Sequence, residues 1–179
     1  MTKSRDEIYI SVDIEASGPI PADYSLLSIG LCLVLAPETH FYLELQPISD
    51  NAVPDPLAVT GFSLSKLKER GTPPKAAMEK FAHWIDANTR EQVPVFVGFN
   101  ACFDWAFVNW YFHHFLERNP FGIGGIDIKA YYMGSSRIRW TETTSSQLPA
   151  RLAFQKLQAH NALQDAIAQG ELFRKLLKS

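Results

Sequence analysis

Three strand-like segments joined by short links open the chain, and they constrain its fold more than any other feature. Residues 7–13 and 41–45 alternate between apolar and polar side chains, whereas residues 26–35 are nearly all apolar. A period of two indicates a half-buried strand, and a continuous apolar run indicates a central one. Because the links are short, we expect the three segments to form an antiparallel meander with residues 26–35 in its middle.

Helix-like segments alternate with extended segments in the rest of the chain. Residues 93–98 are predicted to form a short buried strand, and residues 137–146 are polar without a clear period. Helices are predicted over the ranges 63–69, 75–87, 104–116, 127–133 and 162–177. This order implies an α/β fold with a mixed sheet flanked by helices. Ligands of such sheets bind at strand ends, near a switch in strand order.

The composition is that of a single globular domain spanning residues 1–179, with 46% hydrophobic and 20% charged residues. Two cysteines in apolar surroundings predict a reducing compartment rather than a disulfide framework. The N-terminus has no apolar signal core, and the longest apolar run, residues 29–36, is too short to span a membrane. A cytoplasmic location without a membrane partner is therefore expected. The net charge of −2 excludes a strongly basic nucleic-acid binder, but it does not exclude a nucleic-acid enzyme.

Two carboxylates stand at the end of the first strand-like segment. Asp13 and Glu15 are two residues apart, so on a strand both point to the same side, while Val12 and Ile14 point into a core. Adjacent acids repel each other unless a divalent cation compensates them. The alternative is an exposed strand end with two solvated acids, which is the commoner case for an isolated Asp-x-Glu.

A third acid, Asp104, lies where a loop meets a predicted helix. Asn100 is predicted to cap this helix, and the helix dipole favours a carboxylate in the first turn, so Asp104 suits a purely stabilising role. However, the neighbours Phe103, Trp105 and Phe107 are bulky and apolar. A carboxylate in such surroundings usually has a charged partner or a metal ion.

His160 and Asp165 stand five positions apart near the end of the chain. On one helix this separation turns the side chains through ~500° and leaves them ~140° apart, so they cannot share one face. If both serve one site, His160 lies in the loop before the helix and Asp165 in its first turns. The alternative, which a lone histidine by itself favours, is that His160 is an ordinary helix-entry residue.

Together, and in this order, these short motifs resemble the DEDDh branch of the DnaQ-like 3′–5′ exonuclease superfamily, which includes proofreading exonucleases, ribonuclease T and oligoribonuclease. The resemblance covers most of the chain. It rests on Asp13-Ile14-Glu15 with Ser17-Gly18, on Asn100-Ala101-Cys102-Phe103-Asp104 with Phe107, and on His160-Asn161-Ala162-Leu163-Gln164-Asp165-Ala166. It implies a ribonuclease H-like fold, in which a mixed five-stranded sheet with three antiparallel first strands is flanked by helices.

The resemblance also implies a mechanism. Asp13, Glu15, Asp104 and Asp165 would hold two Mg²⁺ or Mn²⁺ ions, and His160 would take the proton from the attacking water. The implied reaction is hydrolysis of phosphodiester bonds from the 3′ end of DNA or RNA, with release of 5′-mononucleotides. The implied partner is the 3′ end of a single-stranded nucleic acid, and a homodimer is compatible with the family.

Candidate nucleotide-binding residues follow from the family positions: Ala16, Ser17, Asn100, Phe103 and Phe107. The sequence departs from the family at Phe99, where members often have histidine, and at Ala16-Ser17-Gly18, where many have Thr-Gly. Neither departure removes a ligand.

Aromatic and basic residues in the C-terminal half are further candidates for nucleic-acid contacts. Bases could stack on Trp140, Tyr131 and Tyr132, although core packing is the alternative for any aromatic residue. Phosphates could bind to a basic surface patch formed by Lys129, Arg137, Arg139, Arg151 and Lys156. Alternatively, these residues are scattered over a solvated surface.

Two other functions compete with a stand-alone exonuclease. One is a non-catalytic nucleic-acid-binding module that keeps the fold. It is disfavoured because a retired site has no physical reason to keep five ionisable groups together. The other is the proofreading subunit of a polymerase, which is disfavoured because the chain extends little beyond the final predicted helix.

Overall fold

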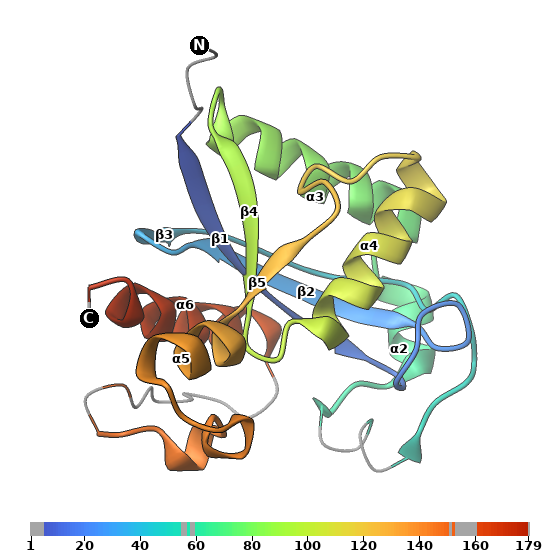
Figure 1. Ribbon diagram of the computed structural model, residues 1–179. Coiled ribbons are helices and arrows are strands. Elements are labelled where there is room, and N and C mark those ends of the chain that lie inside the picture. The colour runs from blue at the N-terminus through green and yellow to red at the C-terminus, as the bar shows by residue number, and fades with distance from the viewer. Residues whose placement is uncertain (1–5, 55–56, 58–59, 151, 153–160, 179) are drawn as a thin grey trace.

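A computed structural model of the chain shows a five-stranded sheet between two layers of helices (Figure 1). The structure describes residues 6–54, 57, 60–150, 152 and 161–178. The strands are β1 (Glu7–Ala16), β2 (Leu26–Leu33), β3 (Ala36–Glu44), β4 (Val93–Gly98) and β5 (Gly125–Asp127). The helices are α2 (Leu64–Arg70), α3 (Pro74–Thr89), α4 (Cys102–Leu116), α5 (Ile128–Ser136) and α6 (Ala162–Leu176), with the 3₁₀ turns η1 (Trp140–Glu142) and η2 (Ser145–Gln147).

The strand order is β3-β2-β1-β4-β5. The pairs β1–β2 and β2–β3 are antiparallel, which confirms the predicted meander, and the pairs β1–β4 and β4–β5 are parallel. The carboxyl ends of β1, β4 and β5 therefore lie at the same edge of the sheet. The pairing of β1 with β4 runs only from Glu7–Val93 to Ser11–Val97, and beyond that point the two strands separate.

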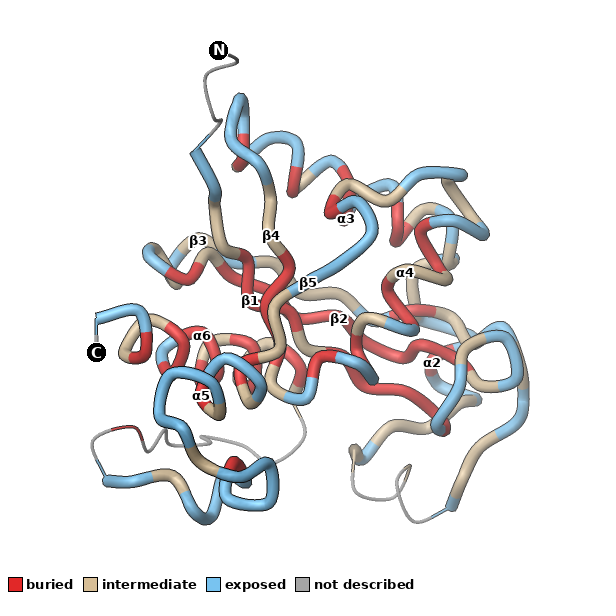
Figure 2. Tube along the Cα trace, viewed as in Figure 1, coloured by how far each residue is buried: buried red, intermediate tan, exposed pale blue. Residues whose placement is uncertain are grey.

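Each face of the sheet has its own hydrophobic core. Alternate residues of β1, namely Ile10, Val12 and Ile14, are buried in a core shared with α3 and α4. A second core includes residues of α5 and α6. Figure 2 shows the buried segments concentrated along β1, β2 and the inner sides of the helices. The odd-numbered residues of β1, including Asp13 and Glu15, consequently face α6.

The structure differs from the sequence prediction in several places. β1 continues to Ala16, with a bulge between Glu15 and Ala16, so both acids belong to the strand. β3 begins at Ala36, and β5 was not predicted because three residues are too few to show alternation. The polar stretch 137–146 contains η1 and the start of η2, which ends at Gln147. None of the described helices is long and apolar enough to cross a bilayer.

The prediction that Asn100 caps α4 is wrong. The cap position is Ala101, whose side chain makes no capping hydrogen bond. Asn100 lies one residue earlier in the left-handed region, with φ of 67°, and its carbonyl accepts a hydrogen bond from the N–H of Phe103 at 3.3 Å. Asn100 thus forms the turn that leads into the helix, because asparagine tolerates this backbone conformation better than most residues.

Candidate metal centre

Three carboxylates meet at the carboxyl end of β1. Asp13, Glu15 and Asp165 each offer an oxygen, and these oxygens all lie within 4.8 Å of one another. The structure confirms that Asp13 and Glu15 share a face of the strand and that Asp165 lies in the first turn of α6. Acids this close raise each other's electrostatic energy, and oxygen-only donors are the ligands that hard divalent cations prefer. The donor set therefore suits Mg²⁺ or Mn²⁺.

Small residues let α6 approach the sheet closely enough to deliver Asp165. A Cβ on Gly30 of β2 would overlap the backbone of Ala162 and Leu163 at the start of α6. The hydroxyl of Ser11 donates a 2.7 Å hydrogen bond to the carbonyl of Ala166, the residue after Asp165. The helix is thus docked on β1 and β2 in a fixed register.

The side chain of Asn161 begins α6. Its Oδ1 accepts a hydrogen bond from the N–H of Gln164 at 3.1 Å, as a helix-capping residue does. The cap fixes the first turn of the helix, which carries Asp165.

Asp104 approaches the same strand end from the opposite layer. Its Oδ1 accepts a 3.0 Å hydrogen bond from the N–H of Ile14, the residue between Asp13 and Glu15. Only 5% of Asp104 is exposed. Burial, with smaller contributions from the negative charges of Glu15 and Asp127, raises the pKa of Asp104 to about 8, although the Ile14 N–H opposes the shift. Without a cation, burial therefore favours the protonated form of Asp104.

Gln169 bridges the two separating strands, and the sequence analysis did not identify it. Its Nε2 donates to the carbonyl of Val12 on β1 at 2.8 Å, and its Oε1 accepts from the N–H of Phe99 after β4 at 2.6 Å. The side chain is 2% exposed. A glutamine within an amphipathic helix carries no signal in the sequence, because only the fold shows which backbone groups it must satisfy.

Asp127 joins the starts of two helices beside the acids. Its Oδ2 accepts from the N–H of Ala101, before α4, at 2.7 Å, and its Oδ1 accepts from the N–H of Ala130 in α5 at 2.9 Å. Asp127 was predicted only as a helix start, without a role in the site.

The five candidate nucleotide-binding residues lie in different environments. Phe103 is 37% exposed, and Asn100 is also exposed. Ala16 and Phe107 are buried, and Ser17 is fully buried. The Ser17 hydroxyl donates to the carbonyl of Asn51 at 2.8 Å and accepts from the N–H of Ser25 at 2.9 Å. Phe103 and Asn100 alone among the five expose substantial surface.

The other predicted residues fall into three groups: some pack in the core, some are exposed, and some lie outside the described residues. Tyr132 is 7% exposed and packs in the core, whereas Trp140 is 46% exposed. Three candidates lie outside the described residues: His160, Arg151 and Lys156.

Known proteins resemble this chain in sequence and in fold. The sequence profile of a family named RNase T and described as exonuclease matches residues 12–173. The 3′-5′ DNA exonuclease Cap18 of Escherichia coli is 48% identical over 169 residues, which cover 94% of this chain and 90% of that protein.

Solved structures of exonucleases share the architecture. The nuclease domain of 3′hExo, a DEDDh family member bound to rAMP, superposes with a TM-score of 0.78 at 14% identity, covering 99% of this chain and 94% of that one. E. coli Exonuclease I in complex with a dT13 oligonucleotide has a TM-score of 0.75 at 15% identity, covering 97% of this chain and 41% of that one. These superpositions confirm the predicted ribonuclease H-like fold with a mixed five-stranded sheet.

Proposed function

The chain belongs to the RNase T family of exonucleases, and from that premise we propose that it removes nucleotides from the 3′ end of DNA and releases 5′-mononucleotides. One observation carries the proposal: carboxylates from β1 and α6 converge within 4.8 Å at the carboxyl end of the sheet. DNA is proposed as the substrate because Cap18, at 48% identity, is named as a DNA exonuclease.

Asp13, Glu15, Asp104 and Asp165 are proposed to hold two Mg²⁺ or Mn²⁺ ions. Cations at this site would lower the pKa of the attacking water and offset the charge that develops on the phosphate and on the leaving 3′ oxygen. The raised pKa of Asp104 supports its inclusion, because a buried carboxylate needs a cation to stay ionised at neutral pH. The Ile14 N–H keeps one oxygen of Asp104 oriented toward the strand end.

His160 is proposed to accept the proton of the attacking water. The residue precedes the capped start of α6, which carries Asp165 in its first turn. An ordinary imidazole titrates near ~6.5, so a neutral ring is available as a base at the pH of the cell.

The candidate nucleotide-binding residues are proposed to act in two ways. Phe103 and Asn100 expose surface next to Asp104, so they are suited to direct contact with the terminal nucleotide. Ala16, Ser17 and Phe107 are buried, so they would shape the walls behind it. Ser17 would do this through its hydrogen bonds, which hold the loop after β1.

The test is hydrolysis of a single-stranded DNA oligonucleotide labelled at its 5′ end, with RNA and duplex DNA of the same sequence for comparison. With Mg²⁺ or Mn²⁺ we expect a ladder that shortens from the 3′ end, release of 5′-mononucleotides, and no reaction in EDTA. Asp13→Asn should lower the rate by about 100-fold or more, since each cation contributes several kcal/mol to charge stabilisation.

The matched control is Glu79→Gln, which removes an exposed carboxylate on α3 and should leave the rate unchanged. His160→Ala should also lower the rate strongly. Wild-type activity in EDTA, or in the Asp13→Asn variant, would contradict the proposal.

A further inference from the structure

We infer that Trp140 and Lys129 form a second contact for nucleic acid, a platform that binds a base and a phosphate of the single strand leading to the carboxylates. This inference rests on the proposed exonuclease function and specifies its substrate as a single strand.

An ammonium group and an exposed indole are paired at this position. Lys129 Nζ lies 4.2 Å from the centroid of the Trp140 ring and 6.0 Å from that of the Phe99 ring. Trp140 nevertheless leaves 46% of its surface open. A large aromatic ring that stays exposed is available for stacking, and the neighbouring ammonium adds a positive charge where the attached phosphate would lie.

The backbone turn that carries Trp140 is held by its own hydrogen bonds. The carbonyl of Trp140 accepts hydrogen bonds from the hydroxyl of Thr143 at 2.7 Å and from its N–H at 3.1 Å, and Thr143 is fully buried. Glu142 Oε2 accepts from the N–H of Arg139 at 2.8 Å on the other side of the turn. The backbone at Trp140 is therefore ordered before any ligand binds, which lowers the entropic cost of binding.

A chain of contacts among half-buried and buried residues connects the platform to the carboxylates. Lys129 lies over Phe99, whose N–H is bonded to Gln169, and Gln169 is bonded to Val12, the residue before Asp13. Lys129 is also in the first turn of α5, next to its cap Asp127. On this inference, a strand whose 3′ end lies at Asp13 places a preceding nucleotide on Trp140.

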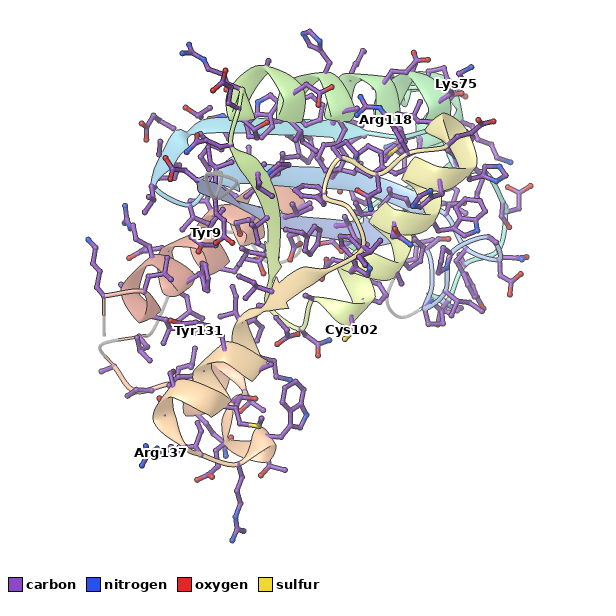
Figure 3. The ribbon with its side chains drawn as sticks, turned by 45° about the horizontal axis from the view of Figure 1, so that its top comes forward. Tyr9, Lys75, Cys102, Arg118, Tyr131 and Arg137 are labelled. Carbon is purple, nitrogen blue, oxygen red and sulfur yellow. The ribbon has the colours of Figure 1, made fainter. Side chains whose placement is uncertain are left out.

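Other aromatic and basic residues of α5 are less suited to this role. The Tyr131 ring packs edge-on against Phe173 of α6, with centroids 5.4 Å apart, and Figure 3 shows it between the two helices. Arg137 lies at the far end of α5 and points away from the start of α4, which Cys102 marks in the same figure. Among these described residues, Lys129 and Trp140 are thus the pair best suited to bind a base and a phosphate.

The chemistry of the platform favours single-stranded nucleic acid over a duplex. A base stacks on an indole through its π-face, which all bases share, so binding should tolerate any sequence. Bases in a duplex are already stacked on their neighbours and are not available to the ring. We therefore expect single-stranded DNA to bind in preference to duplex DNA.

The experiment compares two substrates of the full chain with Mn²⁺. A 12-nucleotide oligo-dT spans the carboxylates and the platform, whereas the p-nitrophenyl ester of thymidine 5′-monophosphate is too small to reach both. In Trp140→Ala the ratio of kcat/KM for the oligonucleotide to that for the ester should fall about tenfold, and Trp140→Phe should restore part of it.

Binding is measured separately by fluorescence anisotropy of labelled oligo-dT in EDTA, where no hydrolysis is expected. Trp140→Ala should raise the Kd about tenfold. Lys129→Gln should reduce the slope of log K against log salt by about 0.7, the value for one phosphate contact on a single strand. The control is Lys75→Gln, an exposed lysine at the start of α3 on the opposite side of the molecule (Figure 3), which should leave the slope unchanged.

The outcomes separate this inference from the proposed function. If the wild-type protein hydrolyses both substrates and the variants keep the wild-type ratio, Kd and salt slope, Trp140 and Lys129 merely pack the corner of α5 and the inference is wrong. The same conclusion follows if duplex DNA binds as tightly as the single strand. If the wild-type protein hydrolyses neither substrate, the proposed function itself fails. Lys129→Gln changes an extended surface side chain, so it remains informative even if Trp140→Ala does not fold.

Discussion

At the scale of single residues, Asp104 shows how the fold prepares a carboxylate for a cation. The side chain is buried, and it accepts the N–H of Ile14, which the separation of β1 from β4 leaves without a strand partner. Burial disfavours its charged form more strongly than this hydrogen bond favours it, so its pKa rises from 3.8 to about 8. A bound cation lowers the pKa of Asp104, so the carboxylate ionises at a lower pH than in the metal-free protein.

We predict that Asp104 makes the stability of the metal-free protein decrease with pH. The folded state holds a proton on this group between pH 4 and 8, whereas the unfolded state has lost it, so the free energy of unfolding should fall across this range and level off above it. Urea titrations in EDTA at several pH values measure this effect. Relative to Asp104→Asn, the free energy of unfolding of the wild type should fall by at least about 1.4 kcal/mol across this range.

Asparagine is a suitable comparison because its amide oxygen can still accept the Ile14 N–H but cannot ionise. A difference between wild type and Asp104→Asn that stays constant from pH 4 to 8 would show that Asp104 is ionised throughout.

At the scale of elements, two devices fix α6 against the sheet. Gly30 removes a side chain where the start of the helix crosses β2, and Gln169 binds one backbone group on each side of the gap between β1 and β4. The first device sets how close Asp165 comes to Asp13. The second sets the spacing of the strand ends that carry the site.

We predict that Gln169→Leu destabilises the protein by about 2–4 kcal/mol, because it removes the hydrogen-bond partner of the buried carbonyl of Val12 and of the partly buried N–H of Phe99. Gln169→Glu should cost less, since a carboxylate still accepts the Phe99 N–H. Both should raise the Mn²⁺ concentration that gives half-maximal activity. Denaturant unfolding and a Mn²⁺ titration measure these two effects.

The control for this prediction is Gln164→Leu on the same helix, whose half-buried side chain is not part of the bridge. Equal losses of stability in Gln164→Leu and Gln169→Leu would mean that the bridge makes no specific contribution.

We predict that Gly30→Ala lowers the free energy of unfolding by about 1–3 kcal/mol, because its Cβ would overlap the backbone at the start of α6 and push the helix away. The weaker docking should also weaken Mn²⁺ binding, measured by calorimetry. Gly134→Ala is the matched control: no atom lies within 4 Å of its Cβ, and alanine in α5 should stabilise the helix slightly. Wild-type stability and Mn²⁺ affinity in Gly30→Ala would contradict this packing argument.

At the scale of the whole molecule, the helices α4, α5 and α6 all begin at the edge of the sheet where β1, β4 and β5 end (Figure 1). Their N-terminal N–H groups carry partial positive charge, which favours the carboxylates of Asp104 and Asp165 in the first turns and attracts a phosphate. These partial charges offset part of the negative charge that the carboxylates concentrate at this edge.

We predict that Mn²⁺ stabilises the folded protein as a whole. A cation that binds only the folded state, at 100 times its Kd, adds about 2.7 kcal/mol, which corresponds to an increase in Tm of about 5–10 °C for a chain of this size. Thermal unfolding with Mn²⁺, against NaCl of equal ionic strength, measures the shift. Asp13→Asn should lose most of it, and an equal shift in that variant would place the cation elsewhere.

Local periodicity was sufficient to predict the meander and the position of the first two acids. Side chains alternate along any strand, so Asp13 and Glu15 had to share a face wherever the strand lay. The position of Asp165 in the first turn of α6 followed in the same way from the geometry of a helix. The role of His160 stays a prediction.

Tertiary structure alone decided which partners these residues have. Gln169, Asp127 and the burial of Asp104 depend on where β1 and β4 separate and on which backbone groups are then left to be satisfied. These groups lie far apart in the sequence, and no local pattern records them. The sequence therefore determined which chemical groups the site contains, and the packing of α4, α5 and α6 against the sheet determined their spacing and their charge.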